Sequence, residues 1–364
     1  MSLRNLAALL AVALLVALPL FASDFFVTFI MTRTVMLGLA ASTIVFLSAN
    51  VGMVSLAQML MFGIAGFMIG NAVGEPGSKG LKLGWNPWVA VVFALAIVTA
   101  VACVLGALSA RTAGIYFLML TLTYAVIGYY FFGQVTTFSG FGGITGIRPP
   151  GVLAGHPVRL YYVGVVVSVL AYCGFRALAR TPFGMALQGV RDDPIRMASL
   201  GFNVGLLRAL AFTLAGFVAG VAGILNIWWN GQIDPASISI GPTLDLLIIA
   251  VIGGIAHLEG AWLGAFVFVI ANNYMRDLPG ASTLGLTEAR FNTVVGLLVL
   301  LVMVLSPDGL VGVVMRLYGW IRRPAADPES PLPSGTGEHP LESADSGPPG
   351  RDLVPSQTTE GSLR

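Results

Sequence analysis

The chain has 364 residues, of which 56% are hydrophobic and only 10% are charged. In an ordinary soluble domain, about a quarter of the residues are charged. This chain has too few charged residues to form the water-exposed surface of a soluble protein of its size. The composition indicates a protein of the lipid bilayer. It excludes a cytosolic enzyme, a nucleic-acid-binding protein and a small disulfide-bonded scaffold, and the scattered histidines and cysteines predict no metal site.

The C-terminal segment 324–364 differs in composition from the rest of the chain. It holds seven acids against two arginines and eight of the twenty prolines, so its net charge is −5 and that of the remaining body is +7. A segment of this kind cannot bury enough apolar surface to order itself. We therefore predict a membrane domain over residues 1–323 and a disordered, acidic, Pro/Gly-rich tail over residues 324–364.

Long apolar runs along the body predict membrane-spanning helices, which need about 20 apolar residues each. These runs are Leu6–Ala22, Phe25–Leu47, Val51–Val73, Trp88–Leu108, Ala113–Phe132, Leu160–Ala179, Ala209–Trp229 and Phe291–Leu305. A further run, Leu244–Ala271, contains His257 and Glu259, which are costly at the bilayer centre. We expect two short helices there, joined by a turn around residues 253–260. The predicted fold class is an all-α, polytopic membrane helix bundle of about ten segments, some of them short or discontinuous.

Arginine placement predicts the orientation of these segments. With the N-terminus inside, ten basic residues fall on the cytoplasmic side and seven on the other side, and five arginines lie between Arg176 and Arg208. Both termini are therefore expected in the cytoplasm.

The chain lacks the residues of a nucleotide-binding site. A P-loop needs Gly-Lys followed by Ser or Thr, but the only lysines, Lys79 and Lys82, do not follow glycine. We expect no cofactor, no catalytic residue and no enzymatic activity in this chain; if ATP powers its function, another chain binds it. Only Asp245, Glu259 and Arg33 are placed to enter the membrane. The sequence therefore gives little support to a proton relay, which needs a series of ionisable residues there.

The polar stretch Asn50–Gln58 lies between two apolar runs. Its candidate pathway residues are Asn50, Gly52, Ser55 and Gln58. Glycine and polar side chains at membrane depth predict a broken helix that lines a pathway. The alternative is that Asn50, Ser55 and Gln58 only form hydrogen bonds between helices.

The long loop Gly174–Gly205 is the largest polar stretch on the predicted inner side. Asp192 or Asp193 can cap a short helix that has Pro194 in its first turn, and Ile195, Ala198 and Leu200 would give it an apolar stripe. Such a helix either docks into a groove of a partner protein or lies on the membrane surface.

Six stretches in order between residues 34 and 312 resemble the permease of branched-chain amino acid ABC importers. They are Gly52–Phe67, Arg111–Tyr124, Gly142–Ile147, Gly189–Gly201, Val251–Gly264 and Leu305–Gly312. Met53, Ala57, His257, Glu259 and Asp308 depart from the residues usual in that family. The resemblance adds Tyr116 and Thr121 to the expected pathway and identifies residues 176–208 as a cytoplasmic coupling loop. Its expected ATPase contacts are Arg191, Asp192, Asp193, Pro194, Ile195, Arg196, Leu200 and Gly201.

The resemblance implies an importer subunit for branched-chain or other hydrophobic amino acids that forms half of a translocation pathway. The implied partners are a second homologous permease, two cytoplasmic ABC ATPases that bind ATP and Mg²⁺, and a periplasmic or lipid-anchored substrate-binding protein. The implied location is the plasma (inner) membrane of a prokaryote. A urea or short-amide importer uses a very similar permease, and an ion-coupled secondary transporter and a structural membrane subunit without a pathway are further alternatives.

Overall fold

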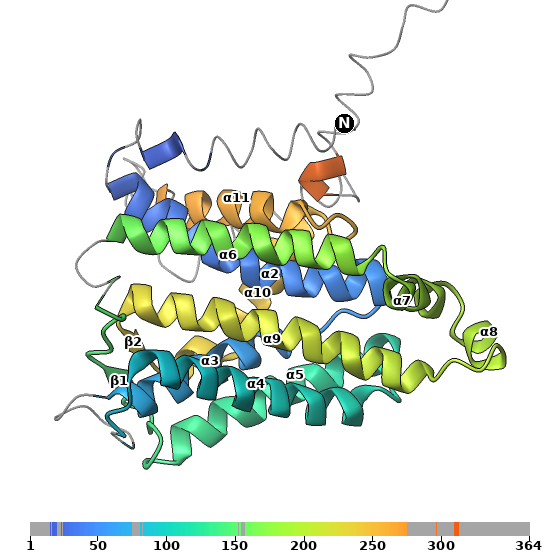
Figure 1. The fold of residues 1–364 in the computed structure, drawn as a ribbon, viewed down its shortest axis with the longest axis horizontal. Helices are drawn as coiled ribbons and strands as arrows, with labels where there is room; N and C mark the ends of the chain where they lie inside the picture. The colour runs from blue at the N-terminus through green and yellow to red at the C-terminus, as the bar shows by residue number, and fades with distance from the viewer. Residues whose placement is uncertain are drawn as a thin grey trace, which may run out of the picture. The chain divides into compact units, whose positions relative to one another are not determined.

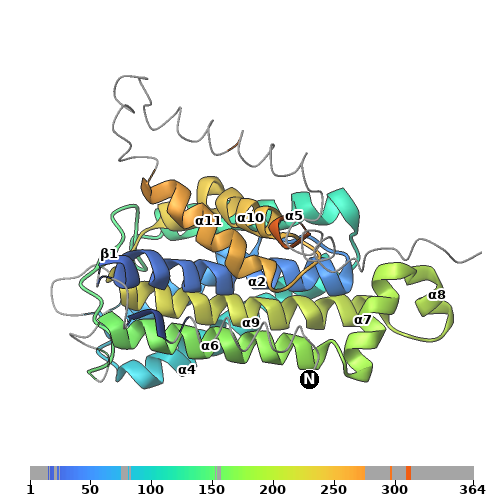
Figure 2. The same cartoon turned by 90° about the horizontal axis from the view of Figure 1, so that it is seen from above.

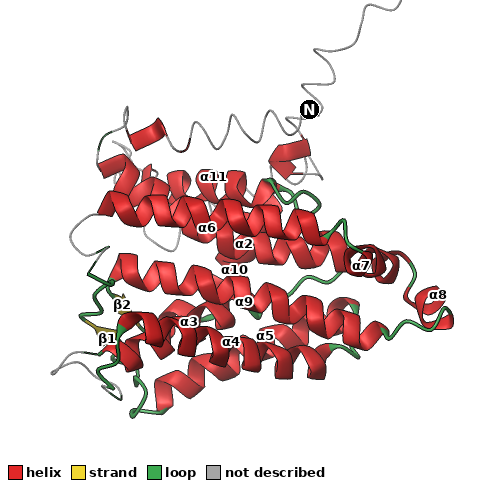
Figure 3. Ribbon diagram, viewed as in Figure 1, coloured by secondary structure: helices red, strands yellow, loops and turns green. Residues whose placement is uncertain are grey.

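The computed structural model describes residues 15, 17–19, 23, 25–74, 81, 83–151, 153, 157–274, 296 and 309–312. Nearly all of these lie in helices, as Figure 3 shows, so the predicted all-α class is confirmed. The helices are η1 (Phe26–Met31), α2 (Thr32–Val51), α3 (Gln58–Val73), α4 (Pro87–Ser109), α5 (Gly114–Gln134), α6 (Pro157–Leu178), α7 (Pro182–Asp192), α8 (Pro194–Ser199), α9 (Val204–Asn230), η2 (Pro235–Ile238), α10 (Ile240–Gly253) and α11 (Gly260–Tyr274).

Eight of the ten predicted membrane segments correspond to described helices. Five are long and apolar enough to span a membrane: Phe26–Val51, Pro87–Ser109, Gly114–Gln134, Val158–Leu178 and Val204–Asn230. Three shorter apolar helices are Gln58–Val73, Ile240–Gly253 and Gly260–Asn273. The last two confirm that Leu244–Ala271 forms two short helices joined by a turn. The predicted spans Leu6–Ala22 and Phe291–Leu305 lie largely outside the described residues, and the predicted tail lies wholly outside them.

Helix α2 lies at the centre of the bundle, where it contacts α6, α9, α10 and α11. Figure 2 shows α10 and α11 side by side next to it. In the most apolar part of Phe26–Val51, 78% of the residues are buried, against 28% for both α4 and α5. The polar and apolar residues of α2 are not separated onto two faces, so no side of the helix prefers water and α2 is suited to this enclosed position. Helices α4 and α5 leave long apolar faces free for lipid or for another protein.

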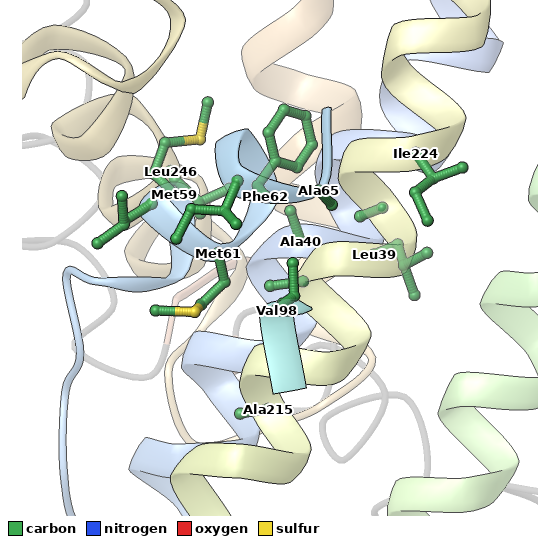
Figure 4. Close-up of a cluster of buried hydrophobic side chains, with 14 of the residues drawn as sticks. Leu39, Ala40, Met59, Met61, Phe62, Ala65, Val98, Ala215, Ile224 and Leu246 are labelled. Atoms are coloured by element: carbon green, nitrogen blue, oxygen red, sulfur yellow. The ribbon is translucent and has the colours of Figure 1, made fainter. Parts of the chain in front are cut away.

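Small residues allow the close approach of α9 to α3 and α4. A Cβ atom at Gly223 would lie 2.0 Å from the carbonyl oxygen of Phe62, and one at Gly216 would lie 2.7 Å from the Cβ of Ala102. Close packing of this kind holds membrane helices together because lipid provides no hydrophobic drive between them. Figure 4 shows side chains of the resulting cluster, which includes Phe62 of α3, Val98 of α4 and Ala215 of α9.

The bundle has two distinct ends (Figure 1). At one end, β1 (Ile144–Thr145) pairs antiparallel with β2 (Gln232–Ile233), which joins the α5–α6 connection to the α9–α10 connection. At the other end lie α7 and α8, next to the C-terminus of α2. We refer to this second end as the α7 end. It is the end that the arginine distribution assigns to the cytoplasm.

The connection between α6 and α9 is more helical than the predicted long loop. The hydroxyl of Thr181 accepts a hydrogen bond from the N–H of Gly184 (3.2 Å), and this cap starts α7. Leu187 and Val190 are buried and anchor α7, which contacts α2 and α9. Two glycines weaken the helical signal of this sequence, but a Cβ atom at Gly184 would lie 2.1 Å from the carbonyl oxygen of Leu178. Glycine is therefore required there by close packing.

Candidate translocation and coupling site

The predicted helix break between two apolar runs is present in the structure. Helix α2 ends at Val51, Gly52 has a φ of +72°, residues 53–57 are not helical, and α3 begins at Gln58. With 16 residues, α3 is about 24 Å long, which is less than the roughly 30 Å of the hydrocarbon core. A helix this short does not cross the hydrocarbon core by itself, so segment 52–57 is needed to complete the span, and its backbone groups must find partners inside the protein.

A threonine of α5 supplies one of these partners. The N–H of Leu56 donates to the Oγ1 of Thr121 (3.1 Å), and the N–H of Ala57 donates to the Oγ of Ser55 (3.2 Å). The side chains of Ser55 and Thr121 are fully buried. Thr121 lies seven residues, or about 10 Å, beyond the start of α5. The structure therefore brings together Thr121 and Ser55, which were predicted from separate motifs.

Gln58 begins α3 and is fully buried. Neither its Oε1 nor its Nε2 atom has a hydrogen-bond partner among the described residues. An unsatisfied buried polar group costs about 1–3 kcal/mol, so such groups are rare in native proteins. The N-terminus of α3 adds a partial positive charge at the same place. This position offers two amide atoms and a helix dipole to a polar ligand or a water molecule.

Two predicted pathway residues lie elsewhere. Asn50 is in the last turn of α2, where its Nδ2 donates to the carbonyl of Phe46 (3.1 Å). Tyr116 is 74% exposed on α5. Its exposure places it on what we name the outer face of α5, which consists of Tyr116, Met119, Thr123, Ile127 and Tyr130. The structure does not bring Asn50 or Tyr116 to the buried cluster of Ser55, Gln58 and Thr121.

The predicted short helix of the coupling loop is α8, and Asp193 is its cap. The Oδ1 of Asp193 accepts hydrogen bonds from the N–H groups of Ile195 (3.0 Å) and Arg196 (2.9 Å), while Pro194 occupies the first helical position. No residue of α8 is buried, and α8 lies at the far tip of the α7 end in Figure 1. Ile195 and, just after the helix, Leu200 are 79% and 66% exposed. The chain turns away at Gly201, with a φ of +88°.

Unlike the other residues predicted to contact an ATPase, Arg191 has a side chain that contacts the end of α2. Its Nε donates to the Oδ1 of Asp192 (2.9 Å), and its Nη1 donates to the carbonyl of Ala49 at the end of α2. The predicted coupling residues therefore fall into two groups: Ile195 and Leu200 face solvent, whereas Arg191 reaches toward the helix break.

A comparison of the sequence with models of known protein families identifies the family of this chain. Residues 4–306 match the family described as "Branched-chain amino acid transport system / permease component". The chain belongs to this family. The match covers most of the membrane domain, including the helix break and α7–α8, and it confirms the resemblance inferred from the sequence motifs.

Individual relatives of this permease carry several transport names. The LivM permease of the high-affinity branched-chain amino acid system of Escherichia coli is 31% identical over 178 residues, which cover 49% of this chain and 39% of LivM. A probable LivM of Methanocaldococcus jannaschii is 25% identical over 296 residues, 75% of this chain and 84% of the relative. The autoinducer 2 import permease LsrC of an Enterobacter strain is 30% identical over 201 residues, 51% of this chain and 55% of LsrC. The alignment thus spans less than half of the E. coli LivM, and no solved structure matches.

Glu259, one of the two acids expected to enter the membrane, is paired with an arginine in this permease. The hydroxyl of Tyr172 donates to Glu259 (2.7 Å), Arg176 donates to the Tyr172 hydroxyl (2.6 Å), and Arg176 and Glu259 form a 3.9 Å ion pair. Sequence reasoning missed the Tyr172–Arg176 pair, although its i, i+4 spacing on α6 is a signal for neighbouring side chains.

Proposed function

We propose that this chain is the permease subunit of an ATP-driven importer for branched-chain or other hydrophobic amino acids. It forms half of the translocation pathway and couples to separate ATPase subunits. The observation that carries the proposal is the interrupted span between α2 and α3, with buried Ser55, Thr121 and the unpartnered Gln58. A membrane subunit with only a structural role has no need of an orphaned amide at membrane depth.

The second half of the pathway would come from a homologous permease that packs on the outer face of α5. This face combines two tyrosines and a threonine with apolar side chains. The exposed face of α4 is instead dominated by aliphatic residues: Val89, Val92, Val104 and Leu108, with Trp88 at its end. Tyrosine is favoured at protein interfaces because a hydroxyl needs a hydrogen-bond partner in an apolar environment. Tyr116 would then face the pathway between the two permeases.

Energy would enter through α8 at the α7 end. The chain has no P-loop, so ATP and Mg²⁺ would bind to two cytoplasmic ATPase subunits, and this chain would catalyse no bond-making step itself. The exposed Ile195 and Leu200 are suited to fill a groove on an ATPase. Closure of the ATPases around ATP would displace α8 and shift the spans against each other.

The remaining features of the proposal follow from orientation and family. The α7 end and both termini would lie in the cytoplasm, and the protein would reside in the plasma (inner) membrane of a prokaryote. A periplasmic or lipid-anchored binding protein would deliver the substrate at the opposite end. That receptor would set most of the ligand specificity.

Among the relatives of this chain are permeases named for autoinducer 2 import, so the family carries more than one class of substrate. The sequence resemblance keeps a urea or short-amide substrate as the alternative, and the ligand of the receptor would decide between the two.

The test is uptake by the purified assembly. The chain is affinity-tagged, isolated from its own cell membrane together with its partners, and reconstituted in liposomes with the receptor on one side and ATP on the other. We expect leucine uptake that requires both ATP hydrolysis and the receptor. Uptake driven by a proton gradient without ATP would refute an ATP-driven importer, and uptake of urea but not leucine would transfer the proposal to the amide class.

A further inference from the structure

Arg191 joins two segments that are 142 residues apart. Its guanidinium donates a hydrogen bond to the carbonyl of Ala49, in the last turn of α2, while Arg191 itself lies in the last turn of α7. A contact between the end of a coupling helix and the end of a central span has a mechanical consequence, because α2 stops at the interrupted segment 52–57.

The carbonyl of Ala49 is available to Arg191 because α2 ends where it does. In a continuing α-helix, this carbonyl would accept a hydrogen bond from the N–H of Met53, four residues on. Instead, the N–H of Met53 donates to the carbonyl of Leu47 (3.3 Å), and that of Gly52 donates to the carbonyl of Ser48 (3.1 Å). Arg191 thus takes the place of the next helical turn. Its charge strengthens the hydrogen bond and complements the negative end of the helix dipole.

Gly52 leaves the room that the arginine needs. A Cβ atom at this position would lie 2.8 Å from the Cγ of Arg191. The φ of +72° is also one that residues with a side chain adopt only at a cost. One glycine therefore both ends α2 and permits the contact with α7.

The contact between Arg191 and Ala49 links the exposed helix α8 to the helix break. Toward the tip of the α7 end, Arg191 is followed after two residues by α8, with its exposed Ile195. Toward the interior, the segment after Ala49 continues to Leu56, which is hydrogen-bonded to Thr121 of α5. A displacement of α7 therefore acts directly on the end of α2 and on the polar break.

We infer that Arg191 is a positioning residue that transmits movement of α7 to the helix break, rather than a residue that docks the ATPases. The inference rests on the proposed function, because it assigns a role within ATP-driven transport. It separates the coupling loop into a docking part, α8, and a transmitting part, Arg191.

The experiment compares variants of the intact importer, purified with its partners and reconstituted as above. The measured quantities are the amount of co-purified ATPase, the rate of ATP hydrolysis and the number of substrate molecules taken up per ATP. For Arg191→Gln, we expect ATPase content and hydrolysis within about twofold of the wild type and uptake per ATP reduced tenfold or more. Arg191→Lys keeps a charged donor with fewer N–H groups, so it should retain more uptake per ATP than Arg191→Gln.

The matched control is Arg180→Gln, an exposed arginine in the α6–α7 connection, which should leave all three quantities unchanged. Loss of the ATPases from the Arg191→Gln complex would show that Arg191 docks them and would overturn the inference. Wild-type uptake per ATP would overturn it as well. If the Arg191→Gln permease does not insert into the membrane or purify, Arg191→Met, which keeps an unbranched side chain but has no N–H donor, decides by the same ratio, and wild-type coupling there refutes the inference. Absence of ATPases from the wild-type sample would instead refute the proposed function.

Discussion

Replacing Gln58 by methionine separates a transport role of this residue from a structural role. Methionine has a similar length and shape but no hydrogen-bonding amide. Because neither amide atom of Gln58 has a partner among the described residues, the substitution removes two unsatisfied polar groups from a fully buried position. Each such group costs about 1–3 kcal/mol, and replacement by an apolar group is neutral or stabilising. The free energy of unfolding should therefore stay unchanged or rise, by at most about 2–6 kcal/mol for the two groups together.

Transport should change in the opposite direction. If the two amide atoms bind the passing substrate or its water, their loss removes two hydrogen bonds, each with a net contribution of about 0.5–1.5 kcal/mol. Together this is about 1–3 kcal/mol of barrier height, or a five- to 150-fold lower uptake rate.

The assay is ATP-dependent leucine uptake in liposomes, with thermal unfolding of the same sample in detergent. Gln134→Met, at the exposed end of α5, serves as the control and should alter neither quantity. A Gln58→Met variant with wild-type uptake would remove Gln58 from the pathway. A variant that loses more than about 2 kcal/mol of stability would show that the amide has a structural partner.

Further predictions concern the coupling helix, the tail, the orientation and the turn between α10 and α11. Ile195→Asp should release the ATPases, because truncating a central interface residue costs about 2 kcal/mol or more; co-purification at the wild-type ratio would contradict this and favour a helix that lies on the membrane. Removal of residues 324–364 should leave membrane insertion and uptake near normal, and loss of assembly would reveal a docking role of the tail. A single cysteine at Met185, which is 58% exposed, should react with an impermeant reagent only after cells are permeabilised; labelling of intact cells would place the α7 end outside. Tyr172→Phe removes the hydroxyl that bonds Glu259 and should lower stability by about 1 kcal/mol, measured by thermal unfolding, without changing ATPase co-purification.

Local features of the sequence were sufficient to predict the membrane class, the described spans and several helix ends. Apolar runs predict spanning helices because lipid requires every backbone group to bond within its own segment. The split of Leu244–Ala271 followed from the cost of placing His257 and Glu259 in one helix, and α10 and α11 confirm it. A cap at Asp192 or Asp193 before Pro194 was predicted, since capping depends on neighbours two and three residues away, and the structure shows that Asp193 is the cap. Gly52 and the polar residues after it predicted the helix break for the same local reason.

The tertiary structure decided which of these residues act together. Leu56 meets Thr121 across 65 positions, and Arg191 meets Ala49 across 142. Such contacts depend on how helices α2, α5 and α7 pack, and no short-range pattern encodes the packing of helices so distant in sequence. Likewise, Gln58 and Thr121 are both polar residues in the sequence, but only the packing shows that Thr121 accepts a hydrogen bond from Leu56 whereas Gln58 has no partner among the described residues. The sequence determines the segments because membrane burial acts residue by residue, whereas the site arises from the helix packing that brings distant segments together.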